Sequence, residues 1–231
     1  MEDNKKPTFN VLFARGIVEQ DYLEFLKKIF PDYNVVGIIR ELNKSLPNVI
    51  NLILFTGGED VTPSFYGETK GKFTKNNRHR DDIEQDLFHR MYYQIPKLGV
   101  CRGAQFLTVM AGGKLIQHVT GHNNTTDSIY YNNGKVLNIP SDHHQMMYPF
   151  NLDKSKYSIL GHSLHFKSDT YLNGENENIE LPENFLEPEI VFYNDFNSLC
   201  IQSHPEWISD NTDPSFKSIM NLIRSKVLKE N

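Results

Sequence analysis

The sequence is poor in cysteine, lacks long apolar runs and carries no excess of positive charge. Its 231 residues include only two cysteines, Cys101 and Cys200. No apolar run approaches the roughly 18 residues that span a membrane, which argues against a membrane partner. The net charge of −5 argues against a nucleic-acid partner.

Linkers, repeats and a signal peptide are also missing. No stretch rich in proline, glycine or serine divides the chain, so residues 1–231 predict a single domain. Residues 1–8 are polar and lack the apolar core of a signal peptide, so we expect a cytoplasmic protein. In the cytoplasm a disulfide between the two cysteines is not expected. Cys101 is then free to react. Cys200 lies in a predicted strand, where we expect it to be buried.

The spacing of apolar residues predicts an α/β fold. In the first half, short apolar runs alternate with helix-like segments, the pattern of βαβ units and a parallel sheet. In the second half, strands separated by turns rich in Asn, Gly and Asp predict an antiparallel extension. The predicted class is a flavodoxin-like, doubly wound, mainly parallel sheet with helices on both faces and a small antiparallel extension.

The predicted elements can be given by residue range. Strands are expected at 11–14, 34–39, 52–55, 97–100, 114–119, 135–139, 157–160, 189–193 and 199–202. Helices are expected at 19–29, 81–93, 105–111 and 214–228. The acidic, proline-containing segment 173–187 predicts a surface excursion.

The run Gly99-Val100-Cys101-Arg102-Gly103 places a cysteine between two glycines, after a predicted strand and before a predicted helix. Small flanking residues permit a sharp strand-to-helix turn that points the central side chain outward as an exposed nucleophile. The N-terminus of the helix favours a thiolate at this position. Cys101 is therefore the candidate catalytic nucleophile.

A cysteine nucleophile needs a base, and His204-Pro205-Glu206 follows the last predicted strand. His204 would take the proton of Cys101, and Glu206, on the same side of an extended segment, would hold the other imidazole nitrogen. Alone, this tripeptide also fits a surface turn. Combined with the elbow, it predicts a triad of Cys101, His204 and Glu206.

The double glycine Gly57-Gly58 follows the predicted strand 52–55. Without side chains, its backbone N–H groups can approach a substrate oxygen. We predict that the N–H groups of Gly58 and Arg102 form an oxyanion hole, with a plain tight turn as the alternative.

The remaining polar motifs allow a functional and a structural interpretation. His143 and Gln145 are predicted to line the pocket opposite Cys101, and a structural histidine is the alternative. Arg80 either faces the substrate, fixes a loop through an ion pair, or merely begins a helix whose first-turn carboxylates complement the dipole. Trp207 either shields the site from water or only packs beside it.

The chain has nine histidines, several of them in close pairs: His118 with His122, His143 with His144, and His162 with His165. None of these pairs comes with the cysteine or carboxylate spacing of a known metal site. We therefore expect no metal site.

Three motifs together resemble the class I glutamine amidotransferases: Thr56-Gly57-Gly58, the elbow followed by Ala104-Gln105, and His204-Pro205-Glu206-Trp207. More narrowly, the segments 57–68, 80–84 and 141–145 resemble the branch of γ-glutamyl-γ-aminobutyrate hydrolases and peptidase C26-like γ-glutamyl hydrolases. The resemblance implies the same triad and oxyanion positions, and no metal or organic cofactor. The residues expected to bind substrate are Gly57, Gln105, His143 and Gln145.

The implied chemistry is cleavage of a γ-glutamyl amide through a glutamyl thioester on Cys101. In one version the substrate is glutamine, and the ammonia passes to a separate ATP-dependent synthetase or ligase. In the second version a free-standing hydrolase releases an amine or amide metabolite from a γ-glutamyl conjugate. A catalytically inactive binding or regulatory module is the third alternative.

Overall fold

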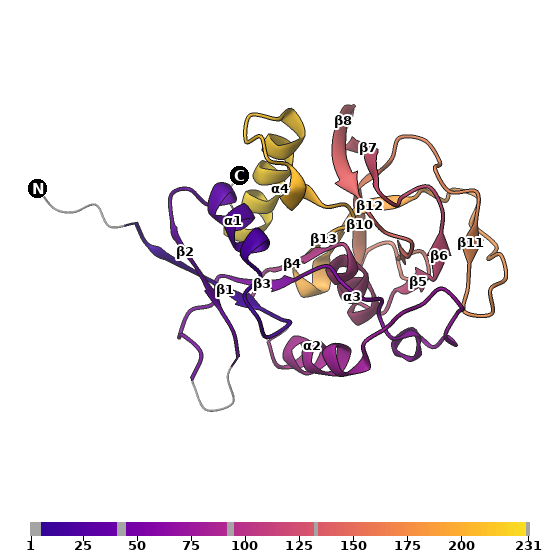
Figure 1. Ribbon diagram of the computed structural model, residues 1–231, viewed down its shortest axis with the longest axis horizontal. Helices are drawn as coiled ribbons and strands as arrows, with labels where there is room; N and C mark the ends of the chain where they lie inside the picture. The colour runs from indigo at the N-terminus through magenta and orange to yellow at the C-terminus, as the bar shows by residue number, and fades with distance from the viewer. Residues whose placement is uncertain (1–5, 41–44, 92–94, 132–133, 230–231) are drawn as a thin grey trace, which may run out of the picture.

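The structure is a computed structural model that describes residues 6–40, 45–91, 95–131 and 134–229 (Figure 1). Within these residues, nine strands form one mixed sheet in the order β2-β1-β3-β4-β13-β12-β10-β7-β8. Five of them are parallel: β2 (Asn34–Ile38), β1 (Thr8–Phe13), β3 (Leu52–Phe55), β4 (Lys97–Val100) and β13 (Ser198–Ile201). Their order is that of a flavodoxin-like sheet, so the predicted fold class is confirmed.

The four other strands of the sheet are antiparallel, so the extension is larger than the sequence predicts. They are β12 (Pro188–Tyr193), β10 (Tyr157–Ser163), β7 (Thr125–Tyr131) and β8 (Lys135–Ser141). Two small sheets pair β5 (Lys114–Ile116) with β9 (Met146–Tyr148), and β6 (His118–Val119) with β11 (Tyr171–Leu172). The strand predicted at 114–119 is thus divided into β5 and β6, while β7, β9 and β11 have no counterpart in the prediction.

Helices cover both faces of the sheet (Figure 1). One face carries α1 (Gln20–Ile29) and α4 (Pro214–Leu228), and the other carries α2 (Arg78–Arg90) and α3 (Arg102–Met110). Helix α4 begins where predicted, because Asp213 caps its first N–H groups and Pro214 fits the first helical position. No helix in the part of the chain that the structure describes has the length and apolar composition of a membrane span.

Two further predicted segments differ from the structure. Helix α2 begins at Arg78 rather than at residue 81, because the Asn77 side chain caps it by accepting the Arg80 N–H. The end predicted for this helix, at Tyr93, lies outside the described residues. The acidic segment 173–187 is not wholly a surface excursion, since Phe185 and Glu187 at its end are buried.

The fold brings three distant segments to one edge of the sheet. Strand β4 pairs with β3 on one side and with β13 on the other, all in parallel. Their carboxyl ends therefore lie together, where doubly wound sheets bind ligands. Gly57 follows β3, Cys101 follows β4, and His204 follows β13.

Candidate functional site

Cys101 occupies a strained turn between β4 and α3. Its backbone has φ 51° and ψ −112°, a conformation that costs about 1–3 kcal/mol for a residue with a side chain. The turn needs glycine at position 103, because a Cβ atom there would lie 2.0 Å from the carbonyl oxygen of Phe55. This is the strand-to-helix elbow that the flanking glycines predict.

The Cys101 side chain is buried, contrary to the exposed nucleophile expected from the elbow. It is 7 % accessible, and the loop after β8 contacts it, with the Asp142 carbonyl oxygen 3.9 Å from Sγ. Cys200 lies in β13, as predicted, and burial raises the pKa of its thiol well above the ordinary value. Both cysteines are free thiols, and Cys101 is the one that forms a hydrogen bond with a histidine.

His204 lies close to Cys101, with Gly57 against both residues. A Cβ atom at Gly57 would lie 3.5 Å from His204 Cε1 and 3.8 Å from Cys101 Cβ. On the other side of the ring, Nδ1 lies 2.7 Å from Oε1 of Glu206. Burial opposes a charged imidazole, but hydrogen bonds with Cys101 and Glu206 raise the pKa of His204 to about 10. The structure therefore stabilises the imidazolium from two sides.

The sequence predicts that Glu206 and His204 lie on one side of an extended segment. In the structure Glu206 instead reaches His204 through a turn. Residues Pro205–Trp207 form the 3-10 helix η3, because Pro205 begins a turn directly after His204. Trp207, in the same turn, stacks on the imidazole with ring centroids 3.9 Å apart and an angle of 4° between the planes. Trp207 is still 51 % exposed, so it covers one face of His204 from the solvent side.

Tyr22 of α1 connects the glycine loop with the triad. Its hydroxyl oxygen accepts the Gly57 N–H at 3.0 Å. Burial, and next the negative charge of Glu206, raise the pKa of Tyr22 above its ordinary value. Tyr22 lies in the helix predicted at 19–29 and belongs to none of the three motifs, so the sequence carries no signal for this role.

A buried network of charged side chains supports the glycine loop. Arg80 donates at 2.9 Å to each of the two carbonyl oxygens that precede Gly58, and it pairs with Glu84 at 2.9 Å. Arg102 pairs with Asp81 and Glu84. Of the interpretations open for Arg80, the loop-fixing ion pair is the one its contacts support, because the side chain is only 5 % exposed.

The backbone N–H groups of Gly58 and Arg102 are available to a ligand. Within the described ranges, neither group donates a hydrogen bond to a protein acceptor. Gly58 has φ +131°, and a Cβ atom there would lie 2.4 Å from Nη1 of Arg80. Only glycine therefore fits this position.

The residues predicted to bind substrate form one buried group, apart from Gly57. Nε2 of Gln105 donates to the carbonyl oxygen of Gln145 at 3.0 Å, and Nδ1 of His143 donates to the same oxygen at 2.9 Å. The Gln145 amide nitrogen donates to Thr74 at 3.2 Å.

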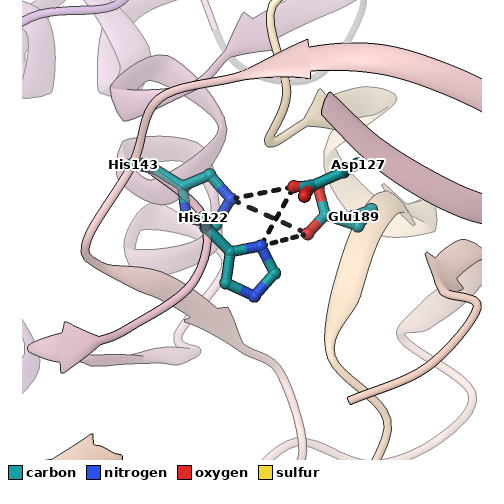
Figure 2. Close-up of side chains that lie close together, drawn as sticks. All are labelled: His122, Asp127, His143 and Glu189. Carbon is teal, nitrogen blue, oxygen red and sulfur yellow. Dashed lines mark hydrogen bonds and ion pairs between the residues drawn. The ribbon is translucent and has the colours of Figure 1, made fainter. Parts of the chain in front are cut away.

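Four buried polar side chains gather beside this group, as Figure 2 shows: His122, Asp127, His143 and Glu189. Burial disfavours charge on His143, but the nearby carboxylates of Asp127 and Glu189 raise its pKa to about 10. In the sequence, His122 is closest to His118 and His143 is closest to His144. In the structure, His122 and His143 lie side by side. Asp127 and Glu189 belong to no recognised motif, so the sequence analysis misses both carboxylates.

The profile of the family described as Peptidase C26 matches residues 16–175. A glutamine amidotransferase-like protein of Lactococcus lactis, YvdE, is 35 % identical over 99 residues, which cover 40 % of this chain and 42 % of YvdE. The curated relatives match over 25 % to 43 % of their own length, so each aligned segment is under half of the relative.

Two solved structures have a similar fold. A glutamine amidotransferase from Thermotoga maritima superposes with a TM-score of 0.60 at 17 % identity, covering 96 % of this chain and 97 % of that chain. PurLQS from Thermotoga maritima gives a TM-score of 0.56 at 15 % identity, with coverage of 97 % and 98 %. The family profile, in contrast, matches at the level of sequence and extends over more than half of the chain, including the glycine loop and the elbow. On that match the chain belongs to the peptidase C26 family.

Proposed function

We propose that the protein cleaves γ-glutamyl amides through a covalent thioester on Cys101. One observation carries the proposal: a cysteine in a strained elbow lies beside an imidazole whose pKa, despite burial, is raised to about 10 by Cys101 and Glu206. A thiolate and an imidazolium in contact are the pair that acyl transfer requires. Membership of the peptidase C26 family supports a hydrolase or a class I amidotransferase.

The proposed reaction uses Cys101 as nucleophile and His204 first as acid and then as base. The thiolate attacks the γ-carbonyl carbon, and the N–H groups of Gly58 and Arg102 stabilise the resulting oxyanion. His204 gives its proton to the leaving nitrogen, the C–N bond breaks, and a glutamyl thioester remains. Neutral His204 then takes a proton from water as the water oxygen attacks the thioester, which releases glutamate and the thiolate. Glu206 orients the imidazole throughout.

Gly57, Gln105 and Gln145 bind the glutamyl part in this proposal, and His143 lines the pocket by holding the Gln145 carbonyl oxygen through its Nδ1. Gly57 leaves space for substrate between Cys101 and His204. Within the described part of the chain, Oε1 of Gln145 is buried without a hydrogen-bond partner, so it can accept a bond from the α-amine.

Ammonia is the first candidate for the leaving group. In this version the protein is a glutaminase that supplies ammonia to a separate ATP-dependent synthetase or ligase. The support is its similarity to a relative named as glutamine amidotransferase-like.

A larger amine is the second candidate, and a groove lined in part by the loop after β8 favours it. The groove has a volume of about 490 Å³ and is lined by Lys72, Phe73, His118 and His144, among others. His144 is two residues from Asp142, whose carbonyl oxygen contacts Cys101. A free-standing hydrolase could place the amine of a γ-glutamyl conjugate in this groove.

The decisive experiment measures glutamate release by the isolated protein from glutamine and from a panel of γ-glutamyl amines. Release from a γ-glutamyl amine with negligible glutaminase activity rejects the ammonia version, and glutaminase activity that requires a co-purified synthetase rejects the free-standing version. A glutamine-analogue electrophile should label Cys101 in the wild-type protein and fail to label the Cys101→Ser variant. No labelling of the wild-type protein, together with no glutamate release, supports the inactive binding module instead.

A further inference from the structure

Four buried polar side chains lie close together beside the antiparallel strands of the sheet, and each comes from a separate segment (Figure 2). His122 precedes β7, Asp127 lies in β7, His143 follows β8, and Glu189 lies in β12. Each of the four side chains is at most 1 % exposed. Two imidazoles and two carboxylates without water around them need either a proton arrangement or a cation to hold them together.

The distances among the four groups approach those of a tetrahedral metal site. Nδ1 of His122 lies 3.0 Å from Oδ2 of Asp127 and 3.6 Å from Oε1 of Glu189. Nε2 of His143 lies 3.7 Å from each of the same two oxygens. Ligand atoms around a tetrahedral Zn²⁺ are about 3.3–3.4 Å apart, since each is about 2.0–2.1 Å from the ion. One ligand atom from each residue lies within 4.8 Å of the other three.

Two of these atoms have no hydrogen-bond partner within the described residues: Nε2 of His143 and Oε1 of Glu189. Both atoms point into the centre of the cluster, as Figure 2 shows. The Nδ1 atom of His143 already donates to the Gln145 carbonyl oxygen, so in the neutral imidazole Nε2 carries a lone pair. A lone pair facing two carboxylate oxygens repels them, so the three atoms need a positive charge between them: a proton on Nε2 in the metal-free protein, or a cation that takes the place of that proton.

Three of the four residues are also held by a hydrogen bond or ion pair to an outer partner, as metal ligands are. The Gln145 carbonyl oxygen holds His143, and Ser203 donates to the second oxygen of Glu189 at 2.9 Å. Lys167 binds the second oxygen of Asp127. The other ring nitrogen of His122 points away from the cluster and lies 3.5 Å from Oε2 of Glu187.

The charges of the cluster leave room for a divalent cation. Asp127, Glu187 and Glu189 carry three negative charges, and Lys167 supplies one positive charge. Imidazoles bind a metal in their neutral form, so in the metal-bound cluster two negative charges remain, and one divalent ion neutralises them. The stacked rings of His122 and His143 lie 4.6 Å apart, a separation at which two imidazolium ions would repel each other.

We propose that His122, Asp127, His143 and Glu189 bind one divalent cation, with Zn²⁺ as the best match. Imidazole nitrogens favour Zn²⁺ over Mg²⁺ or Ca²⁺, which prefer oxygen ligands. Four protein ligands in a closed, buried position make this a structural site. The ion ties β7 and β12 to the loop after β8, whose Asp142 carbonyl contacts Cys101. The proposal departs from the absence of a metal site expected from the sequence, and it does not depend on the proposed reaction.

The test measures metal binding by the full chain produced without a polyhistidine tag. The protein is stripped with a chelator, dialysed, and titrated with Zn²⁺ against a chromophoric chelator, and its bound metal is counted by mass spectrometry. We expect one Zn²⁺ per chain, a higher melting temperature with Zn²⁺ than without, and no competition by excess Mg²⁺. Less than stoichiometric binding by the folded protein in excess Zn²⁺ overturns the proposal.

Variants locate the ion. Asp127→Asn and Glu189→Gln should each weaken Zn²⁺ binding by at least about tenfold. Cys101→Ser and His118→Gln should bind as the wild type does, because they test two other places at which Zn²⁺ could bind, the thiolate and the histidines of the groove. Binding that is lost in either control and kept in the first two variants overturns the proposal.

A spectroscopic measurement on the wild-type protein covers the case in which the cluster variants fail to fold. X-ray absorption at the zinc edge should show only nitrogen and oxygen ligands, with the scattering of two imidazole rings. A sulfur ligand, or a single imidazole, overturns the proposal.

Discussion

The Nδ1 atom of His204 lies 2.7 Å from Oε1 of Glu206, although a single proline separates the two residues. The turn η3 makes this contact possible, because it folds the Glu206 side chain back to the ring. The carboxylate and Cys101 together raise the pKa of His204 to about 10 against the opposing effect of burial. His204 therefore keeps the proton that the leaving nitrogen needs throughout the neutral range.

The pH dependence of kcat/KM follows from this raised pKa. For the wild type, kcat/KM should stay level above neutral pH and fall as the pH rises through about 10, where free His204 loses its proton. Glu206→Gln removes one of the interactions that raise the pKa, so the fall should begin at lower pH. We also expect kcat to drop by a factor on the order of 10³–10⁴, as for loss of the orienting carboxylate in other triads. Asp210→Asn, an exposed carboxylate nearby, serves as the control, and an unshifted profile for Glu206→Gln would contradict the proposed triad.

Trp207 offers a test of the stacked ring. Removing it in Trp207→Ala exposes one face of His204 and removes a cation–π contact of about 0.5–2 kcal/mol, so kcat/KM should fall by roughly 2- to 30-fold. Because Trp207 is 51 % exposed, the urea unfolding midpoint should change little. Trp207→Phe keeps an aromatic face and should retain most of the activity. Equal losses in the two variants would show that the aromatic face does not matter.

Arg80 and Arg78 lie two residues apart in α2 and should differ sharply in their effect on stability. Arg80→Met leaves the buried carboxylate of Glu84 with one partner fewer and frees two carbonyl oxygens, so we expect a loss of about 3–5 kcal/mol in the free energy of unfolding. Arg78→Ala breaks an exposed pair with Asp82 and surface contacts with Ser64 and Phe65, so it should have a much smaller effect. Urea denaturation followed by circular dichroism compares the two variants. Similar stability of both would show that the buried network does not hold the glycine loop.

Local sequence signals predict much of the candidate site. The glycines on either side of Cys101 predict the elbow because so tight a turn accepts no larger residue at position 103. The double glycine at 57–58 and the proline after His204 are likewise backbone signals. Each describes a conformation that a few adjacent residues determine, and such signals can be read without knowledge of the tertiary structure.

The parts that the sequence analysis misses depend on contacts between distant segments. Strand β7 contains two threonines, an aspartate and a serine, which resemble a turn; it is a strand because β8 and β10 pair with it. Glu187 resembles a solvated acidic residue, yet it is buried because it accepts hydrogen bonds from the backbone N–H groups of Lys167 and Ser168. Asp127 and Glu189 are 62 residues apart in the chain, and only the antiparallel sheet brings them together.

Gly103 and Gly16 allow a matched test of the elbow. In Gly103→Ala the new Cβ atom would lie 2.0 Å from the Phe55 carbonyl oxygen, so β3 and α3 must move apart. We expect a loss of about 1–3 kcal/mol in the free energy of unfolding and a large fall in kcat, because the displaced helix carries the N–H of Arg102. Gly16→Ala places a Cβ atom at φ +83° in open space, so it should cost only about 1 kcal/mol of backbone strain and leave kcat unchanged. Chemical denaturation and initial rates on the same preparations separate the two effects, and normal kcat in Gly103→Ala would contradict the role given to the elbow.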